Sequence, residues 1–475
     1  MISLFITAIL LFNYFVWFYY GFVNLIYTGL LCIALVVVLR HIRRIRYAPL
    51  RELLYSSEMP PVSILIPAFN EGDIVIRTVR SAMEMDYPFF DVIVLNDGSD
   101  DHTLEQLIDA YKLKKIDLVY REFIKTEAVR GFYYNREIPN LLVVDKARGG
   151  KPDALNCGIN ISQNPYFCSI DADTIVEPQA LLRLMSSVVA SSKPVVACGG
   201  VVRVMNGVKL RGAFIERIGL PKSFLANFQI VEYLRGFLFG RVGLDFLNAT
   251  LILSGAFSLF QKSSVLAVGG YACDIVCEDM ELVVRLHRHY RKEKLPYLIN
   301  FVTDPICWTE VPEKIRTLAK QRRRWHLGLL QSIVRHRGVL FNPRYGSLGL
   351  SVMPYYLFVE AFSPLVEILG YIAVIGAYVF GLINYEFFVL FLILAVFYGI
   401  FLSVAGVFLE EITYRRYPGW EHLFLLLVFG VLENFGYRQM NSFWRVQAFF
   451  QFLIGWRKWE LSREQPKKGA RQRAQ

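Results

Sequence analysis

Residues 166–174 read YFCSIDADT, and this stretch decides how the sequence is interpreted. An apolar run typical of a buried strand ends in two carboxylates one residue apart, Asp171 and Asp173. Glu177 and Pro178 predict a helix start, because proline is tolerated in the first turn. Ligands of open α/β sheets lie beyond the carboxyl ends of the strands. Two carboxylates there can hold a hard divalent cation with ligand phosphates, although most isolated Asp-x-Asp pairs cap helices or lie in solvated turns.

Short apolar runs alternate with helical patterns on both sides of this stretch, which predicts a mostly parallel, doubly wound α/β sheet. Further strands are expected at residues 62–66, 91–95, 141–144 and 251–260. Helices are expected at residues 74–85, 103–111 and 280–289, and through Asn156 and Ile159. The strands end in polar loop residues that should gather on one edge of the sheet. Residues 112–140 fit neither pattern.

The two ends of the chain are more apolar than its middle. The 475 residues are 54% hydrophobic, with a mean hydropathy of +0.37, which predicts one soluble domain set between membrane segments. Residues 1–39 have no charged side chain and exceed the roughly 20 residues of one untilted span. We expect either two spans with a turn near Tyr20, or one span preceded by an interfacial helix. The basic run at residues 40–46 places the middle of the chain in the cytoplasm of a multi-pass cell-membrane protein.

The C-terminal part predicts further membrane segments. An interfacial helix is expected at residues 345–358, spans at 359–383 and 387–409, a weaker span at 422–435, and a short interfacial or re-entrant segment at 443–454. The expected organisation is a membrane segment with its basic flank over 1–46, a cytoplasmic domain over 60–340, membrane and interfacial helices over 345–455, and a disordered basic tail over 461–475. Residues 221–254 predict either a core helix or an amphipathic helix on the membrane surface.

Charge and cysteine usage argue against a nucleic-acid-binding protein and against a disulfide-bonded one. The net charge of +11 fits membrane topology, and no aromatic-basic motif supports nucleic-acid binding. The seven cysteines are odd in number and form no Cys-x-x-Cys, which indicates free thiols in a reducing compartment.

Two groups of polar residues at expected strand ends are candidates for donor binding. Glu71 and Asp97 follow the first two strands, where a carboxylate can accept hydrogen bonds from a base or a ribose, although such sequences also form ordinary turns. Lys151 follows two glycines and would bring an ammonium and backbone N–H groups to a diphosphate near Asp171 and Asp173. No complete phosphate-loop pattern is present, so a P-loop enzyme is excluded.

Two later groups are candidates for the reacting end of the site. Glu278 and Asp279 precede a helix, where acids complement the helix dipole but can also serve as a general base. Gln321, Arg324 and Trp325 share one helix face, on which a guanidinium suits a phosphate and an indole suits a sugar ring. The ordinary alternative for this last group is a basic cluster beside the membrane.

These motifs, in this order, resemble those of the membrane-embedded family 2 glycosyltransferases, which include hyaluronan, cellulose, chitin-oligosaccharide and poly-N-acetylglucosamine synthases. The resemblance covers roughly residues 60–330. It rests on Pro67-Ala68-Phe69-Asn70-Glu71, Asn96-Asp97-Gly98-Ser99, Gly150-Lys151, Asp171-x-Asp173, Glu278-Asp279 and Gln321-x-x-Arg324-Trp325. It implies a GT-A fold, a UDP-sugar donor and a divalent metal, Mg²⁺ or Mn²⁺. Asn96 departs from the family pattern, which often has an acid there.

The resemblance also implies a role for each matching residue. The nucleoside would be held by Ala68, Glu71 and Asp97, and the diphosphate by Lys151 and Asp171, with Asp173 completing the metal site. Asp279 would be the catalytic base. Donor phosphates and the acceptor sugar would be placed by Glu278, Gln321, Arg324 and Trp325.

The expected reaction is an inverting transfer from a UDP-sugar to a growing β-linked polysaccharide, coupled to its export. The alternative is addition of a single sugar to a lipid. A reading from another class is a membrane transport protein with a nucleotide-sensing domain, in which Glu360, Glu367 and Glu433 line a path. The partners expected with the enzyme are the donor, a saccharide or lipid acceptor and membrane lipids; accessory subunits are compatible with this reading.

Overall fold

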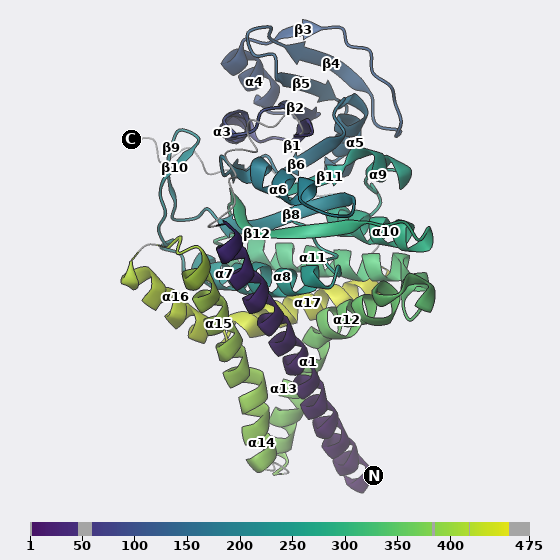
Figure 1. Ribbon diagram of the computed structural model, residues 1–475. Coiled ribbons are helices and arrows are strands. Elements are labelled where there is room, and N and C mark those ends of the chain that lie inside the picture. The colour runs from purple at the N-terminus through teal and green to yellow at the C-terminus, as the bar shows by residue number, and fades with distance from the viewer. Residues whose placement is uncertain (1, 46–58, 382–384, 418, 456–475) are drawn as a thin grey trace.

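The computed structural model describes residues 2–45, 59–381, 385–417 and 419–455, and it stacks an α/β sheet on a group of helices (Figure 1). Within these residues the main sheet has ten strands. Their order across the sheet is β3 (Lys114–Ile116), β4 (Val129–Tyr134), β5 (Leu141–Lys146), β2 (Phe90–Asp97), β1 (Val62–Ala68), β6 (Tyr166–Ile170), β11 (Phe257–Gln261), β8 (Val195–Val204), β12 (Leu298–Thr309) and β7 (Thr174–Val176).

The centre of the sheet is parallel, as the alternating pattern predicted. Strands β5, β2, β1 and β6 run in one direction, and β11 pairs antiparallel with both β6 and β8. The helices that alternate with these strands are α3 (Gly72–Met83), α4 (Thr103–Tyr111), α5 (Lys151–Ile161) and α6 (Ala180–Val189). Since parallel strands end on the same side, the polar residues after β1, β2, β5 and β6 lie on one edge. The predicted mixed α/β fold is confirmed.

Three details of the sheet differ from the sequence prediction. The unassigned residues 112–140 contain β3 and β4, an antiparallel pair at the sheet edge; β3 has only three residues, and β4 contains a glycine. The strand expected at 251–260 begins only at Phe257, and the expected helix begins at Ala180, after Pro178 rather than at it. Between Asp173 and that helix the chain first forms β7, which pairs with β12.

A helical layer separates the sheet from the remaining helices. It contains a continuous helical segment made of α7 (Phe224–Leu234), the π-helix η1 (Arg235–Arg241) and α8 (Val242–Phe246). This segment packs against β8 on one side and against α1 and α15 on the other (Figure 1). Its apolar residues Ile230, Val231 and Leu238 are fully buried, so the core-helix reading of residues 221–254 is correct.

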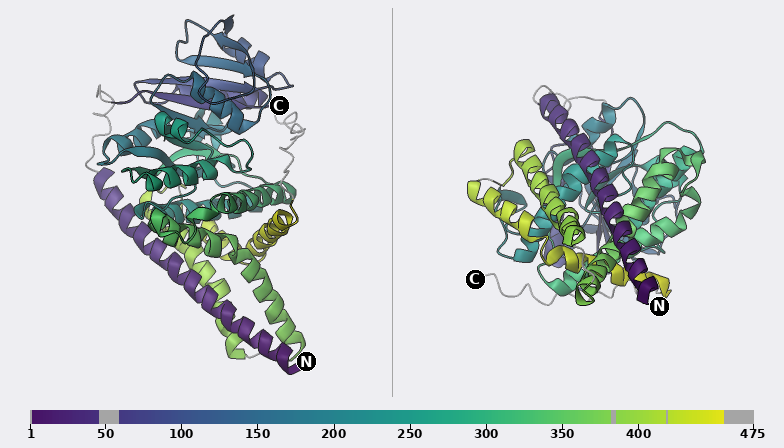
Figure 2. Two further views of the ribbon diagram at one scale, coloured as in Figure 1. Left: turned by 90° about the vertical axis from the view of Figure 1, so that its right-hand side faces the viewer. Right: turned by 90° about the horizontal axis from the view of Figure 1, so that it is seen from below.

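The N-terminal region forms one helix, α1 (Ile2–Ile45), of 44 residues. The helix continues through Tyr20 and Gly21, so the expectation of two spans with a turn there is wrong. Its segment Leu11–Arg40 is long and apolar enough to cross a membrane. Figure 2 shows α1 running along the whole helical part, with its first residues beside the far ends of α13 and α14.

Two further helices among the described residues are long and apolar enough to cross a membrane, Leu348–Val379 and Phe388–Thr413. The first is built from η4 (Leu348–Val352), α12 (Met353–Tyr355), η5 (Tyr356–Ala361) and α13 (Ser363–Val379), so residues 345–358 do not form a separate interfacial helix. The second joins α14 (Tyr385–Leu392), η6 (Ile393–Phe397) and α15 (Tyr398–Thr413).

The last helices are α16 (Trp420–Leu432) and α17 (Tyr437–Leu453). At 13 residues α16 is shorter than an untilted span. Helix α17 packs along α11 (Ile315–Arg335), within the layer between the sheet and the long apolar helices (Figure 1). The basic tail expected at 461–475 lies outside the described residues.

Candidate active site

Four adjacent strand ends bring the donor-site candidates together. In the register of the sheet, Ala68 at the end of β1 is level with Asn96 on β2, and Asn96 is level with Asp145 on β5. The loop after β5 leads into α5 and Lys151, while β6 ends immediately before Asp171. The sequence-predicted groups around Glu71, Asp97, Lys151 and Asp171 therefore share one edge.

Lys151 connects this edge to the reacting group. Its ammonium lies 2.5 Å from a carboxylate oxygen of Asp171 and 3.7 Å from one of Glu278. Burial alone would lower the pKa of Lys151, but the charges of Asp171 and Glu278 outweigh it and raise the pKa above the ordinary range for lysine. The side chain is therefore a permanent cation between two carboxylates from different elements.

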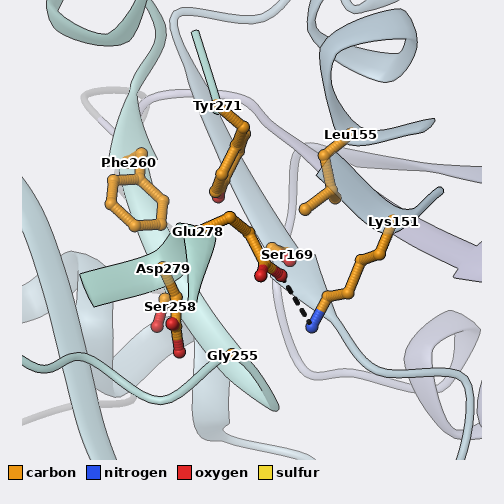
Figure 3. A pocket seen from close by; sticks show the side chains of 9 residues that line it. All are labelled: Lys151, Leu155, Ser169, Gly255, Ser258, Phe260, Tyr271, Glu278 and Asp279. Carbon is orange, nitrogen blue, oxygen red and sulfur yellow. Dashed lines mark ion pairs between the residues drawn. The ribbon is translucent and has the colours of Figure 1, made fainter. Parts of the chain in front are cut away.

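Glu278 and Asp279 form the first turn of α10 (Glu278–Lys292) and line a small cavity with Lys151 (Figure 3). One oxygen of Asp279 accepts a hydrogen bond from the backbone N–H of Met280 (2.8 Å). A Cβ added at Gly255 would lie 3.2 Å from its other oxygen and 3.1 Å from the Lys151 nitrogen. The backbone at Gly255 thus approaches the candidate base and the candidate phosphate ligand at once.

Glu278 has a raised pKa because it is buried and lies beside Asp279, with Lys151 only partly compensating. Its carboxylate therefore needs the lysine to stay charged, and it turns toward Lys151 in the cavity (Figure 3). Of the two adjacent acids, Glu278 is thus tied to the donor side of the site.

Both carboxylate oxygens of Asp97 have partners within the protein. It accepts hydrogen bonds from the backbone N–H groups of Gly149 (2.9 Å) and Gly150 (2.7 Å) and pairs with the ammonium of Lys146 (2.8 Å). Lys146 also lies 2.5 Å from Asp153. Asp97 therefore shapes the loop that carries Lys151, and its nucleoside contact stays a prediction.

Sequence reasoning did not single out Lys146, although its position at the end of a buried strand was the available signal. It also missed an aromatic platform beside the first strand end. The guanidinium of Arg148 lies 4.0 Å from the centre of the Phe69 ring. Phe69 directly follows Ala68, which is buried at the end of β1. The Phe69 ring, with Arg148 over one face, therefore lies at the strand end where the nucleoside was predicted.

The Gln321–Trp325 turn lies on α11, as the helical spacing predicted. The thiol of Cys277 donates to the carbonyl oxygen of Arg324 (3.8 Å), and a Cβ at Gly328 would fall 2.3 Å from the same sulfur. Helix α11 therefore touches the residue that precedes Glu278, without entering the cavity of Figure 3.

The three residues of this turn differ in exposure. Trp325 is 38% exposed, and the guanidinium of Arg322 lies 4.5 Å from the centre of its ring. Gln321 has a buried side-chain oxygen with no hydrogen-bond partner in the part of the chain that the structure describes. Arg322, which the sequence did not distinguish from its neighbours, is buried and pairs with Glu232 of α7 (2.6 Å).

The carboxylates of the Asp-x-Asp turn fit a hard divalent cation. Asp171 is about one third exposed and reaches the same edge as Lys151. The described residues contain no group of three or more His, Cys, Asp or Glu side chains placed to hold a metal. Asp171 and Asp173 would therefore supply two carboxylates, which suits Mg²⁺ or Mn²⁺ shared with phosphates and water.

Comparison with known proteins gives two family matches. The model described as "Glycosyl transferase family 2" matches residues 63–265, and "Glycosyl transferase family group 2" matches residues 166–432, more than half of the chain. Curated relatives include the poly-beta-1,6-N-acetyl-D-glucosamine synthases of Staphylococcus epidermidis and Staphylococcus aureus, each 28% identical over 288 and 298 residues. These alignments cover 60% of this chain and span 59% and 60% of the relatives' length.

Solved structures give weaker likenesses. A mannosyltransferase from Pyrobaculum calidifontis in complex with GDP-Man and Mn²⁺ is 16% identical, with a TM-score of 0.49, over 88% of this chain and 99% of that one. Residues 1–349 of Staphylococcus aureus TarS in complex with UDP-GlcNAc are 12% identical, with a TM-score of 0.37, over 83% and 92%.

Proposed function

Because the chain belongs to the family 2 glycosyltransferases, enzymes of a GT-A-like fold, we propose that it transfers a sugar from a UDP-sugar to a growing β-linked polysaccharide. One observation carries the proposal. Lys151 lines one cavity with the Glu278–Asp279 turn and also pairs with Asp171, although these residues come from α5, from α10 and from the end of β6. This arrangement offers a cation for a diphosphate next to a carboxylate for a proton.

The donor end of the site would hold the diphosphate. Lys151 would contact its oxygens, and the hydrogen bonds from Gly149 and Gly150 to Asp97 would fix the loop that carries this lysine. Asp171 and Asp173 would hold a Mg²⁺ or Mn²⁺ ion, which supplies positive charge for the leaving group. The nucleoside would lie toward Glu71 and the Phe69 ring, beyond the ends of β1 and β2.

The reacting end would use Asp279 as general base. Its carboxylate takes the proton of an acceptor hydroxyl as that oxygen attacks the anomeric carbon, opposite the departing UDP. The new bond forms as the sugar–phosphate bond breaks, so an α-linked donor yields a β-linked product. The backbone hydrogen bond from Met280 to one oxygen of Asp279 supports this role, because it fixes the carboxylate's orientation.

The acceptor would lie between this carboxylate and α11. Trp325, Gln321 and Arg324 are on the helix that touches the start of α10, which supports a saccharide stacked on the indole. The names of the Staphylococcus relatives make UDP-N-acetylglucosamine the first donor to test. The enzyme would lie in the cell membrane with its sheet in the cytoplasm, and its helices would accompany the growing chain outward.

A second candidate function is transfer of one sugar to a lipid. The observation that favours it is the position of α10, which carries Asp279, next to the layer of α7, η1 and α8, against which the apolar helices α1 and α15 pack (Figure 1). A lipid headgroup in the membrane would have a short path to Asp279.

The experiment that tests the proposal is a panel of UDP-sugars incubated with the purified chain, with UDP release measured and the product sized. A long polymer supports polysaccharide synthesis, and a lipid-extractable monoglycoside supports the second candidate. If no donor yields UDP under conditions where UDP itself binds, the transferase proposal is wrong and a transport protein with a nucleotide-sensing domain replaces it.

A further inference from the structure

Arg241 is the last residue of η1 and has an unusual environment. Its guanidinium lies 3.9 Å from the centre of the Phe237 ring, one turn earlier. The Phe237 ring packs in turn against Tyr233, with 5.5 Å between centroids. The Nη1 atom of Arg241 is buried and has no hydrogen-bond partner among the residues that the structure describes. The Nη1 group of a charged side chain is therefore held over an aromatic ring without an acceptor among the described residues.

Tyr233, Phe237 and Arg241 form a row of side chains along this helix. The row begins beside α11. Glu232, the neighbour of Tyr233, pairs with Arg322 at 2.6 Å, and the Arg322 guanidinium covers the Trp325 ring. The row thus begins beside the turn that carries the predicted acceptor residues.

The helix that follows Arg241 shares an apolar cluster with the first turn of α10. Leu244 of α8, three residues after Arg241, belongs to the same apolar cluster as Met280, which directly follows Asp279. Asp279 is also among the charged groups that act on Arg241, whose pKa burial lowers to about 10. In Figure 1, α10 lies between α5 with Lys151 and the helical layer with η1. The helical layer that carries Arg241 and the helix that carries Lys151 therefore lie on opposite sides of α10.

Several other arginines in and around this layer are paired with a carboxylate. Within 4.0 Å, and among the described residues, these pairs are Arg203 with Glu410, Arg235 with Glu433, Arg322 with Glu232, Arg438 with Glu367 and Arg445 with Glu360. Arg241 has no such ion pair within the described ranges. A buried donor without an acceptor costs free energy, so a ligand that supplies one would be bound there.

We propose that Arg241 is an acceptor-binding residue, whose Nη1 donates a hydrogen bond to a hydroxyl of the acceptor saccharide beside Asp279. The inference rests on the proposed transferase function. The hydroxyl groups of a neutral saccharide supply acceptor oxygens without adding charge next to Asp279. Stacking on Phe237 fixes the guanidinium plane, which lets the hydrogen bond select one orientation of the sugar. Trp325 and Arg241 would then hold the acceptor from α11 and from η1.

The test compares Arg241→Gln and Arg241→Lys with the wild-type full chain and with Arg217→Gln, an exposed arginine on β10 (Phe214–Arg217) as a matched control. Initial rates of transfer are measured at saturating UDP-N-acetylglucosamine, or the active donor of the panel, with free N-acetylglucosamine added as acceptor probe. UDP affinity is measured calorimetrically on the same preparations.

Arg241→Gln is expected to raise the acceptor KM about tenfold or more, with UDP affinity within about twofold of wild type, because one charged hydrogen bond is lost. Arg241→Lys keeps the charge but loses the planar guanidinium, so the acceptor KM is expected to rise about threefold. Arg217→Gln should match wild type.

An unchanged acceptor KM in both Arg241 variants overturns the inference, as does a loss of UDP affinity that parallels the loss of transfer. If Arg241→Gln does not fold, Arg241→Lys alone decides by the same two readouts. A wild-type protein that transfers no sugar indicates failure of the proposed function instead, so the two failures are distinguishable.

Discussion

The ammonium of Lys151 lies 2.5 Å from Asp171, which joins the first turn of α5 to the end of β6. A donor diphosphate would enter where this ion pair already exists. When the donor binds, Asp171 would turn from Lys151 toward the metal ion. Lys151 would turn from Asp171 toward the donor phosphates. Lys151 thus keeps Asp171 in position before the donor arrives.

Lys151→Met should lower the affinity for UDP about 10- to 100-fold, since a charged hydrogen bond to phosphate is worth about 1.5–3 kcal/mol. Lys151→Arg keeps the charge, so its affinity for UDP should fall less than that of Lys151→Met. Calorimetric titration with UDP and the metal checks both variants. Wild-type affinity in Lys151→Met would remove this residue from the donor site.

Asp279→Asn should lower kcat about 100- to 10,000-fold while UDP still binds, because only the proton acceptor is lost. Asp274→Asn is the matched control, since Asp274 is exposed on the preceding loop, where it pairs with Arg335. The rate of UDP release from the donor measures both. Full turnover in Asp279→Asn would show that another group takes the proton.

Gly328→Ala should separate α10 from α11, because the new methyl carbon would lie 2.3 Å from the sulfur of Cys277. We expect a loss of about 1–3 kcal/mol in unfolding free energy and a larger loss in transfer. Gly338→Ala, where nothing lies within 4 Å of the added carbon, should be neutral. Thermal unfolding and transfer rates of the two variants provide the comparison, and equal behaviour would contradict the contact.

Lys146→Met should destabilise the sheet by about 3–5 kcal/mol, because it leaves the carboxylates of Asp97 and Asp153 buried without their shared cation. Lys193→Met, at an exposed position, serves as the control. Denaturant unfolding of the two variants measures the difference. A small effect would mean that the two carboxylates find other partners.

The stability of the chain should fall as the pH rises from about 4 to about 7 through the titration of Asp245. Burial raises the pKa of Asp245 to about 7, and the backbone N–H of Phe301 offsets this only in part. An unfolded aspartate titrates near pH 4, so between these values the folded state binds more protons than the unfolded state. Asp245→Asn should flatten this part of the pH profile of the melting temperature, and an unchanged slope would assign it to other groups.

Much of the site could be predicted from sequence because its residues end parallel strands. The order of motifs after β1, β2, β5 and β6 was enough to bring Glu71, Asp97, Lys151 and Asp171 to one edge. Helical spacing likewise placed Gln321, Arg324 and Trp325 on one helix, although it did not show how far each is buried.

The parts that sequence did not predict depend on contacts between distant segments. Arg322 stands in a run of three arginines, and only its ion pair with Glu232, 90 residues earlier, distinguishes it. The burial of Lys146 likewise depends on Asp97 and Asp153 together. The continuity of α1 was missed because a glycine normally weakens a helix, yet a Cβ at Gly21 would meet nothing within 4 Å. The helical residues on both sides of Gly21 keep the helix continuous through it.

The single helix α1 also constrains the order in which the protein is made. At 1.5 Å per residue it is about 66 Å long, roughly twice the thickness of a bilayer core. Its contact with α8 is tight, since a Cβ at Gly243 would lie 2.8 Å from the carbonyl oxygen of Leu30. Helices α8, α13 and α15 are synthesised long after α1. In the membrane enzyme proposed above, α1 would therefore stay in the bilayer without these helical partners until α15 is made.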